Sequence, residues 1–274
     1  MERFNHKTAY IFGGSSGIGL ETGKLLAAAG AHVFIFARTA EKLQAAEKAI
    51  AACASGEDTR YGSLSVDVTD NAAVNAAVEI ALDRFGVPDL LINSAGRGSA
   101  YYFQDIDYAE FNRTIKINLY GPWNTVAALV GHLQPGSHIV NVASIAGFIG
   151  VFGFTGYSAA KFGVIGFSEA LRGELKPRGI GVSVLCPPDT DTPGFHEENR
   201  TKPEETRKIS ASARLMQPEQ VAQALLQGLR KNRFMIIPGF DGKFTYWAKR
   251  LLPGLVSAVM DWDVRKVQKR QNLK

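Results

Sequence analysis

The stretch 8–30, TAYIFGGSSGIGLETGKLLAAAG, places an apolar run, a glycine-rich turn and an Ala- and Leu-rich segment directly after one another. This order predicts a buried strand over 8–14 and a helix over 19–30 that ends at Gly30. Glycines in such a turn let the backbone approach a pyrophosphate, whose charge then lies at the positive end of the helix. A plain glycine-rich turn is the alternative, and the strand–turn–helix context favours dinucleotide binding.

The rest of the chain continues this alternation of short apolar runs and helical patterns. The runs that predict strands span 32–38, 62–68, 89–96, 138–144 and 181–187, and the patterns that predict helices span 41–54, 70–85, 107–133, 157–176 and 218–231. Such alternation predicts an α/β fold with a Rossmann-type, doubly wound parallel sheet. We expect a single domain over 1–233 with a substrate loop at about 189–215, followed by a basic amphipathic C-terminal segment over 234–274.

Composition narrows the class of protein. The apolar fraction of 46% and the charged fraction of 21% are typical of soluble globular proteins. The first residues show no signal peptide, and no run of about 18 apolar residues occurs. The two cysteines, Cys53 and Cys186, lie far apart in no metal-like spacing. We therefore expect a cytoplasmic protein in a reducing compartment, without a metal site.

The basic charge is concentrated towards the C-terminus. The chain carries a net charge of +5, and the part from Arg230 onward holds eleven basic and three acidic residues, which leaves +8 there and −3 elsewhere. This distribution predicts a surface-binding tail and no nucleic-acid-binding core. The apolar stretch 251–260, LLPGLVSAVM, is too short to span a bilayer. The tail either packs on the body or on a partner subunit, or it lies at a membrane surface as an amphipathic segment.

The second predicted strand ends at Phe36-Ala37-Arg38, without an acidic residue. An acid at this place would bind the ribose 2′-hydroxyl of NAD, whereas an arginine suits the 2′-phosphate of NADP. Arg38 therefore favours NADP(H), with an exposed surface arginine as the alternative.

Tyr157 and Lys161 lie four residues apart, on one face of a predicted helix. A neighbouring ammonium lowers the pKa of a phenol, so we expect the pKa of Tyr157 to be shifted toward neutrality, which suits a proton donor or acceptor. Ser144 ends a predicted strand thirteen residues earlier, where a loop can hold its hydroxyl opposite the phenol. Asn118 is a polar residue on an otherwise apolar helix face, and a satisfied core amide is the alternative for it.

In order and spacing, these residues resemble the short-chain dehydrogenase/reductase family over about residues 8–227. The resemblance implies a catalytic tetrad of Asn118, Ser144, Tyr157 and Lys161. It also implies a cofactor site made of Gly13, Ser15, Ser16, Gly17, Ile18, Gly19, Arg38, Asp67, Val68, Asn93, Ala95, Gly96, Tyr157, Lys161, Pro187, Thr190 and Thr192. Phe12 and Ser94 depart from the family pattern, in which threonine and asparagine are usual, and both concern the scaffold near the cofactor turn.

The resemblance also implies a mechanism. NADPH delivers hydride to a ketone, and Tyr157 protonates the forming alkoxide. Ser144 orients the carbonyl, Lys161 holds the nicotinamide ribose, and Asn118 positions water. The family further implies a homodimer or homotetramer that assembles through the helices predicted at 107–133 and 157–176.

Two further stretches narrow the substrate. The loop 187–195, PPDTDTPGF, and the stretch 150–161, GVFGFTGYSAAK, resemble a branch of the family that reduces 3-ketosphinganine to sphinganine with NADPH. We therefore expect a lipid-like ketone as the substrate and contact of 234–274 with a membrane surface. The alternatives are a broader ketoreductase of 3-oxoacyl thioesters or hydroxysteroids, and an NADP-binding regulatory protein without enzymatic activity.

Five residues are candidates for contact with that substrate. Phe148, Phe152 and Phe154 form an apolar wall for an alkyl chain, or else pack in the core or face a second subunit. Asp189 or Asp191 faces the ammonium of the substrate, or else caps the loop through Asx-turns.

Overall fold

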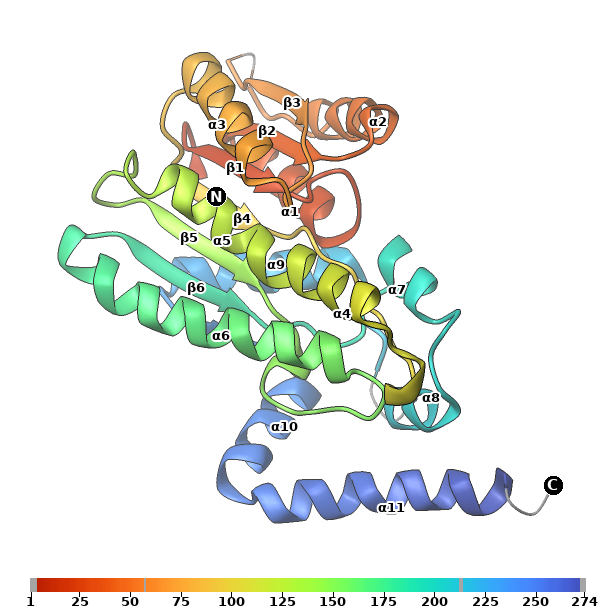
Figure 1. Ribbon diagram of the computed structural model, residues 1–274. Helices are drawn as coiled ribbons and strands as arrows, with labels where there is room; N and C mark the ends of the chain where they lie inside the picture. Colours follow the sequence, from red (N-terminus) through yellow and green to blue (C-terminus); the bar gives the residue numbers. More distant parts are fainter. Residues whose placement is uncertain (1–3, 57, 212–213, 272–274) are drawn as a thin grey trace.

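Parallel strands joined by helices form one sheet in a computed structural model, which describes residues 4–56, 58–211 and 214–271 (Figure 1). Within these residues the sheet has seven strands in the order β3-β2-β1-β4-β5-β6-β7. The strands are β1 Thr8–Phe12, β2 His32–Ala37, β3 Tyr61–Ser65, β4 Leu90–Asn93, β5 His138–Val142, β6 Gly181–Leu185 and β7 Met235–Ile236. The order reverses between β1 and β4, so the predicted Rossmann-type, doubly wound fold is confirmed.

Helices cover both faces of the sheet. On one face lie α1 Gly17–Ala27, α2 Ala40–Ala51 and α9 Pro218–Arg230, and on the other lie α3 Asn71–Phe85, α5 Gly121–Leu129 and α6 Thr155–Leu175. Each predicted strand is present, but each predicted run extends one to three residues beyond the end of its strand. These extra residues leave the sheet at its carboxyl edge, which is where parallel sheets bind ligands.

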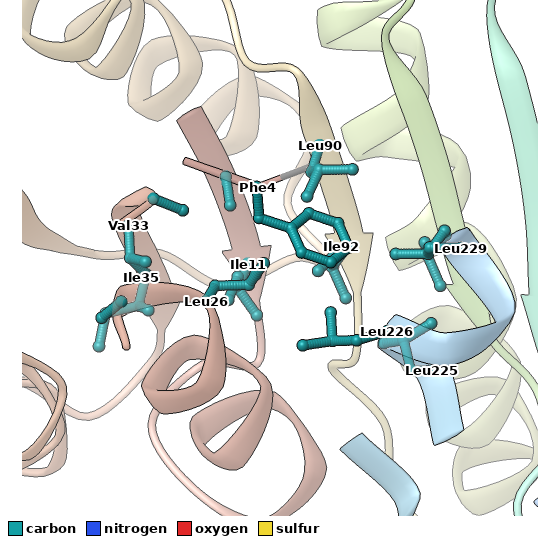
Figure 2. Close-up of a cluster of buried hydrophobic side chains, with 14 of the residues drawn as sticks. Phe4, Ile11, Leu26, Val33, Ile35, Leu90, Ile92, Leu225, Leu226 and Leu229 are labelled. Atoms are coloured by element: carbon teal, nitrogen blue, oxygen red, sulfur yellow. The ribbon is translucent and has the colours of Figure 1, made fainter. Parts of the chain in front are cut away.

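Strand β1 shows how the two faces are filled. Its side chains alternate, so Ile11 joins Leu26 and Leu225 in the cluster under α1, α2 and α9 (Figure 2). Phe12 points to the opposite face, where its ring stacks on Phe36 with centroids 4.1 Å apart. Burial of each such side chain contributes about 2 kcal/mol, so the sheet centre is the rigid base of the loops above it.

The helix predicted over 107–133 is not one regular helix. It consists of α4 Tyr108–Ile115, a π-helical turn over Lys116–Tyr120, and α5. Pro122 at the start of α5 has no N–H to donate to the carbonyl of Asn118, as an α-helix would require. The backbone widens at this point, and π turns of this kind are frequent at functional sites.

The last part of the chain adds elements that the sequence pattern did not separate. The predicted loop near 189–215 contains two short helices, α7 Pro193–Glu198 and α8 Glu204–Ser210. β7 pairs with β6, so the sheet continues beyond residue 233 into the segment that was expected to be the tail. The tail itself folds into α10 Phe240–Leu251 and α11 Pro253–Gln271, which lie at one end of the molecule (Figure 1).

Helix α11 packs against α8 and α10, next to the carboxyl edge of the sheet. Among the residues that the structure describes, no helix combines the length and the apolar character needed to cross a bilayer.

Candidate active site

The turn after β1 has the shape that a diphosphate requires. Gly13 and Gly17 have φ angles of +84° and +54°, a left-handed conformation that favours glycine. A Cβ on Gly13 would collide with the backbone of Ala95, and a Cβ on Gly17 would lie 2.9 Å from Cγ2 of Thr192. Because α1 begins at Gly17, its first N–H groups face this turn. The residues present therefore fit the diphosphate of a dinucleotide.

A cavity of about 920 Å³ joins this turn to the tyrosine of α6 and continues to α10 and α11. Most of the predicted site residues line it. They are Gly13, Ser15, Ser16, Gly17, Ile18, Arg38, Val68, Ala95, Gly96, Asn118, Ser144, Phe154, Tyr157, Lys161, Pro187, Asp189, Thr190 and Thr192. The structure thus brings the loops after β1, β2, β3, β4, β5 and β6 together around one space.

Three predicted cofactor residues do not line the cavity, namely Gly19, Asp67 and Asn93. Gly19 packs against the carbonyl of Gly13, which leaves no room for a side chain. Asp67 accepts two hydrogen bonds at Oδ1, from the backbone N–H and from the hydroxyl of Thr69, both at 2.9 Å. In the structure, these residues shape the loops that carry the lining residues.

Asn93 is also placed behind the cavity. Its side chain is buried at the end of β4, where Nδ2 donates to Oδ1 of Asn141 at 2.8 Å and Oδ1 accepts from the hydroxyl of Thr125 at 2.7 Å. This network ties β4 to β5 and α5, and it fixes the chain that leads to the cavity-lining Ala95 and Gly96.

Of the three predicted wall phenylalanines, the structure places one in the cavity. Phe154 lines it, whereas Phe148 packs edge-to-face on Tyr246 of α10 with ring centroids 5.3 Å apart. Phe152 packs in the same manner on Tyr102 at 6.0 Å. Phe148 therefore attaches the C-terminal helices to the body instead of facing the cavity.

The two predicted loop carboxylates also separate. Asp189 lines the cavity, and its Oδ2 lies 3.8 Å from Nζ of Lys202. Asp191 does not line the cavity, because its carboxylate pairs with Nε2 of His196 at 2.8 Å and accepts from Nε2 of Gln217 at 3.2 Å. Asp191 thus holds the loop to its own neighbours.

Ser144, Tyr157 and Lys161 lie close together in the lining of the cavity. Tyr157 and Ser144 share a hydrogen bond between their side chains, and Oγ of Ser144 accepts from the N–H of Ala146 at 3.1 Å. Nζ of Lys161 donates to the carbonyl of Val142 at 2.9 Å and lies 5.6 Å from the centre of the Tyr157 ring. A phenol, a hydroxyl and an ammonium can together orient a carbonyl and exchange a proton with it.

The expectation that the pKa of Tyr157 is lowered toward neutrality is wrong in this structure. Burial raises the pKa of Tyr157 above its ordinary value, and the carboxylate of Glu198 adds to the rise, while the hydrogen bond with Ser144 opposes it. Burial also lowers the pKa of Lys161 to about 8. The cost of burying a phenolate therefore exceeds the stabilisation that the hydrogen bond with Ser144 gives it, and the phenol keeps its proton at neutral pH.

Asn118 is fully buried in the π turn, and its amide is occupied by backbone groups. Nδ2 donates to the carbonyls of Arg97 and Thr114 at 2.9 and 3.0 Å, and Oδ1 accepts from the N–H of Arg97 at 3.2 Å. The side chain therefore fixes the loop after β4, and the positioning of water by Asn118 stays a prediction.

Several cavity residues were not predicted. Ile149 and Val151 follow Ser144, Phe195 and Glu198 belong to α7, and the C-terminal helices add Phe244, Leu255, Val256, Val259 and Met260. The mixture of apolar and basic residues in 234–274 was a signal for the last group, but it did not show which part of the body they cover. No sequence pattern indicated Glu198 as a cavity residue, because its position depends on how the long segment 189–215 folds.

The sheet, the glycine turn and the Ser–Tyr–Lys group define a dinucleotide-dependent oxidoreductase. A model of the short chain dehydrogenase family matches residues 7–203, and the chain belongs to this family. The family transfers hydride with a nicotinamide cofactor, which agrees with the fit of the glycine turn.

Curated relatives extend the similarity over most of the chain. A 3-ketodihydrosphingosine reductase of Bos taurus is 37% identical over 257 residues, which cover 92% of this chain and 76% of the relative. A 3-dehydrosphinganine reductase of Arabidopsis thaliana is 38% identical and covers 85% and 71%. A 3-oxoacyl-[acyl-carrier-protein] reductase of Chlamydia trachomatis is 34% identical and covers 81% and 89%.

Solved structures agree with this assignment. Levodione reductase superposes with a TM-score of 0.79 at 27% identity, covering 89% of this chain and 99% of its own. A short-chain dehydrogenase from Streptomyces avermitilis superposes with a TM-score of 0.78 at 26% identity, covering 97% and 98%.

Proposed function

We propose that this protein reduces the ketone of 3-ketosphinganine to the alcohol of sphinganine with NADPH, a step of sphingolipid synthesis. The observation that supports it most is the continuation of the cavity past Tyr157 along apolar side chains of α10 and α11. A long alkyl chain needs such a wall. The similarity to reductases named for this substrate, over 92% of the chain in the bovine case, supports the same assignment.

The side chains have distinct parts in this reaction. The bound cofactor supplies the hydride. Tyr157 gives its proton to the ketone oxygen, and it holds this proton at neutral pH because burial and Glu198 keep the pKa of the phenol above its ordinary value. Ser144, hydrogen-bonded to Tyr157, orients the same oxygen. The ammonium of Lys161 beside the ring stabilises the phenolate that remains, and Asn118 positions the water that returns a proton.

NADP(H) is the proposed cofactor. Arg38, Thr39 and Lys42 line the cavity at the end of β2 and the start of α2, and all three are exposed. Two cations and a hydroxyl suit a 2′-phosphate, for which arginine offers a planar set of donors.

The alkyl chain is assigned to the other end of the cavity. Ile149, Val151 and Phe154, from the segment between Ser144 and Tyr157, line the cavity together with Val256 and Met260 of α11. Burying each methylene of the chain contributes about 0.8 kcal/mol, so the wall favours long substrates.

A direct assay tests the reaction. NADPH oxidation is followed with 3-ketosphinganine, an acetoacetyl thioester and a steroid ketone, and we expect the first to have the highest kcat/KM. Tyr157→Phe should reduce kcat by roughly 10²–10⁴-fold while NADPH still binds. Tyr61→Phe, at an exposed tyrosine on β3, is the matched control and should leave kcat unchanged.

Other outcomes contradict the proposal in separate ways. A preference for the thioester would favour a 3-oxoacyl reductase, as in the Chlamydia trachomatis relative. Binding of NADPH without turnover of any ketone would favour a regulatory protein.

The proposal includes contact of residues 234–274 with a membrane surface. Large apolar side chains of α10, of α11 and of the residue between them are exposed, namely Phe240, Phe244, Trp247, Leu251, Leu252, Leu255, Val259 and Trp262. Lys243, Lys249, Arg250 and Lys266 lie on the same helices. Aromatic and basic side chains together suit the headgroup region of an anionic bilayer. Because the same helices line the cavity, a water-insoluble substrate would enter it without crossing water.

Flotation with anionic liposomes tests this contact. The double variant Trp247→Ser/Trp262→Ser should remain at the bottom of the gradient, whereas the unaltered protein rises with the vesicles. Ile80→Ser, at an exposed apolar residue on α3, is the control and should rise like the unaltered protein. Equal flotation of all three would remove the membrane contact from the proposal.

Self-association into a dimer or tetramer is proposed for the face formed by α4, α5 and α6, which lie side by side (Figure 1). Phe111, Tyr120, Trp123 and Phe162 expose large apolar surfaces there. Such clusters are typical of protein interfaces. In sedimentation velocity, Trp123→Glu should shift the protein to the monomer, and a monomeric unaltered protein would contradict the assignment.

A further inference from the structure

A carboxylate lies beside the tyrosine at the substrate end of the cavity. Glu198, the last residue of α7, lines the cavity together with Tyr157, and its side chain is only 10% exposed. Gly98 leaves room for it, because a Cβ at that position would overlap the Glu198 carboxylate. Next to burial, Glu198 is the largest influence that raises the pKa of Tyr157. The carboxylate is therefore within electrostatic reach of the atom that protonates the ketone.

A single lysine is shared between this carboxylate and a second one. Nζ of Lys202 lies 2.9 Å from Oε1 of Glu198 and 3.8 Å from Oδ2 of Asp189, and its side chain is 1% exposed. The rings of Phe154 and Phe195 lie against the ammonium, with centroids 5.6 and 4.8 Å from Nζ. Both carboxylates line the cavity, and Lys202 does not. With both carboxylates ionised, the group has two negative charges and one positive charge, which is a net charge of −1. Burial raises the pKa of Glu198, and the ammonium of Lys202 opposes this rise.

Two further cations that line the cavity, Arg97 and Lys161, are engaged with other groups. Arg97 pairs with Glu110, through contacts of 2.9 and 3.2 Å from Nη1 to the two carboxylate oxygens. Lys161 donates to the carbonyl of Val142, and its pKa is set by burial and then by Cys186. A surplus negative charge in a mostly buried site is costly unless a further cation reaches it.

We propose that Glu198, assisted by Asp189, binds an ammonium group carried on the carbon next to the reacting ketone. This inference rests on the proposed function, since 3-ketosphinganine carries an ammonium at that carbon, and it deepens that function by assigning the residues that recognise it. A bound ammonium brings the group of Glu198, Asp189 and Lys202 to neutrality, with charge-assisted hydrogen bonds that are stronger than neutral ones.

The placement also explains how the site distinguishes substrates. Ser144 and Tyr157 hold the ketone oxygen, so a group on the neighbouring carbon lies near the part of the cavity where Glu198 acts on Tyr157. A ketone without a cation at that carbon leaves the carboxylates with their surplus charge. Specificity of this kind arises from the polar group that stays unpaired with the wrong substrate.

Kinetics with two matched ketones test the assignment. The substrates are 3-ketosphinganine and the same long-chain hydroxyketone with hydrogen in place of the ammonium, each with saturating NADPH. For the unaltered protein we expect kcat/KM to be about 10–100-fold higher for the ammonium-bearing ketone. Glu198→Gln should abolish most of this ratio, because it should lower kcat/KM for that ketone much more than for the other ketone, on which Glu198 acts only through the pKa of Tyr157. Glu197→Gln is the control, because Glu197 is the exposed neighbour that pairs with Arg200.

The other possible results separate a failure of the proposed function from a failure of this inference. If the unaltered protein reduces neither ketone, the proposed function fails, and the inference fails with it. If it reduces 3-ketosphinganine but the ratio is near one, or if Glu198→Gln lowers both rates equally, the inference alone is overturned. If Glu198→Gln does not bind NADPH because it fails to fold, Asp189→Asn decides, since it removes the same surplus charge and should lower the same ratio.

Discussion

The side-chain amide of Asn118 makes two hydrogen bonds with the backbone of Arg97. Oδ1 of Asn118 accepts from the N–H of Arg97 at 3.2 Å, and Nδ2 of Asn118 donates to the carbonyl of Arg97 at 2.9 Å. The two residues belong to different elements, the π turn before α5 and the loop after β4. The pair therefore fixes the distance between the helix layer and the strand end at the centre of the cavity. Asn118, which was expected to position water, therefore has a structural role in this structure: its side chain fixes the loop after β4.

Replacement of Asn118 should cost both stability and activity. Asn118→Leu removes three hydrogen bonds to the partly buried backbone of Arg97 and to the buried carbonyl of Thr114, so we expect the free energy of unfolding to fall by about 2–4 kcal/mol. Urea denaturation measures it. Asn75→Leu, on the exposed face of α3, is the control and should change stability by less than about 0.5 kcal/mol. An equal effect of both variants would show that these hydrogen bonds contribute nothing.

The sequence was sufficient for the sheet and for most of the site because both depend on local patterns. The run 8–14 and the turn after it specify β1, α1 and the glycine positions within one continuous stretch. Lys161 follows Tyr157 by one helical turn, so their shared face needs no tertiary information. Loops at the carboxyl ends of parallel strands then converge by topology alone.

The rest depends on contacts between distant segments. β7 has two residues and becomes a strand only by pairing with β6. Asp67 and Asn93 stand at expected positions, yet their side chains turn to Thr69 and Asn141. Glu198 reaches the cavity only because α7 folds back over Gly98. Such packing leaves no periodic trace in the sequence.

Lys161 should give the cofactor-free protein a distinctive pH dependence. Its ordinary pKa of 10.5 applies in the unfolded chain, and burial lowers it to about 8 in the fold. Between these values the unfolded state binds more protons, so the contribution of Lys161 to stability rises with pH. From about pH 8 to pH 10 the free energy of unfolding should rise by about 2 kcal/mol more than in Lys161→Met.

Urea denaturation of both proteins at the two pH values measures this difference. Burial raises the pKa values of Tyr157 and Cys186, so the contribution of each to the free energy of unfolding falls with rising pH. This fall occurs in both proteins, so the difference between them reports Lys161. Parallel pH curves would mean that Lys161 does not titrate in this range.

The choice of cofactor should depend on the two exposed cations next to β2. Arg38→Ala/Lys42→Ala removes the donors assigned to the 2′-phosphate, so the KM for NADPH should rise by roughly tenfold or more while the KM for NADH changes little. Lys48→Ala, at the other end of α2, provides the control. A rise of both KM values together would point to a general loss of fold or of dinucleotide binding.

Glycines at two helical positions should respond in opposite directions to the same substitution. Gly19→Ala places a methyl group against the carbonyl of Gly13, so the turn must shift, and we expect NADPH binding to be lost and stability to fall by about 1–3 kcal/mol. Gly173→Ala adds the same methyl group in α6, where it meets nothing within 4 Å, so the higher helix propensity of alanine should raise stability by about 0.5–1 kcal/mol. Thermal unfolding and NADPH fluorescence titration measure both effects. If Gly19→Ala binds NADPH normally, the close packing of α1 on its turn is not what shapes the diphosphate site.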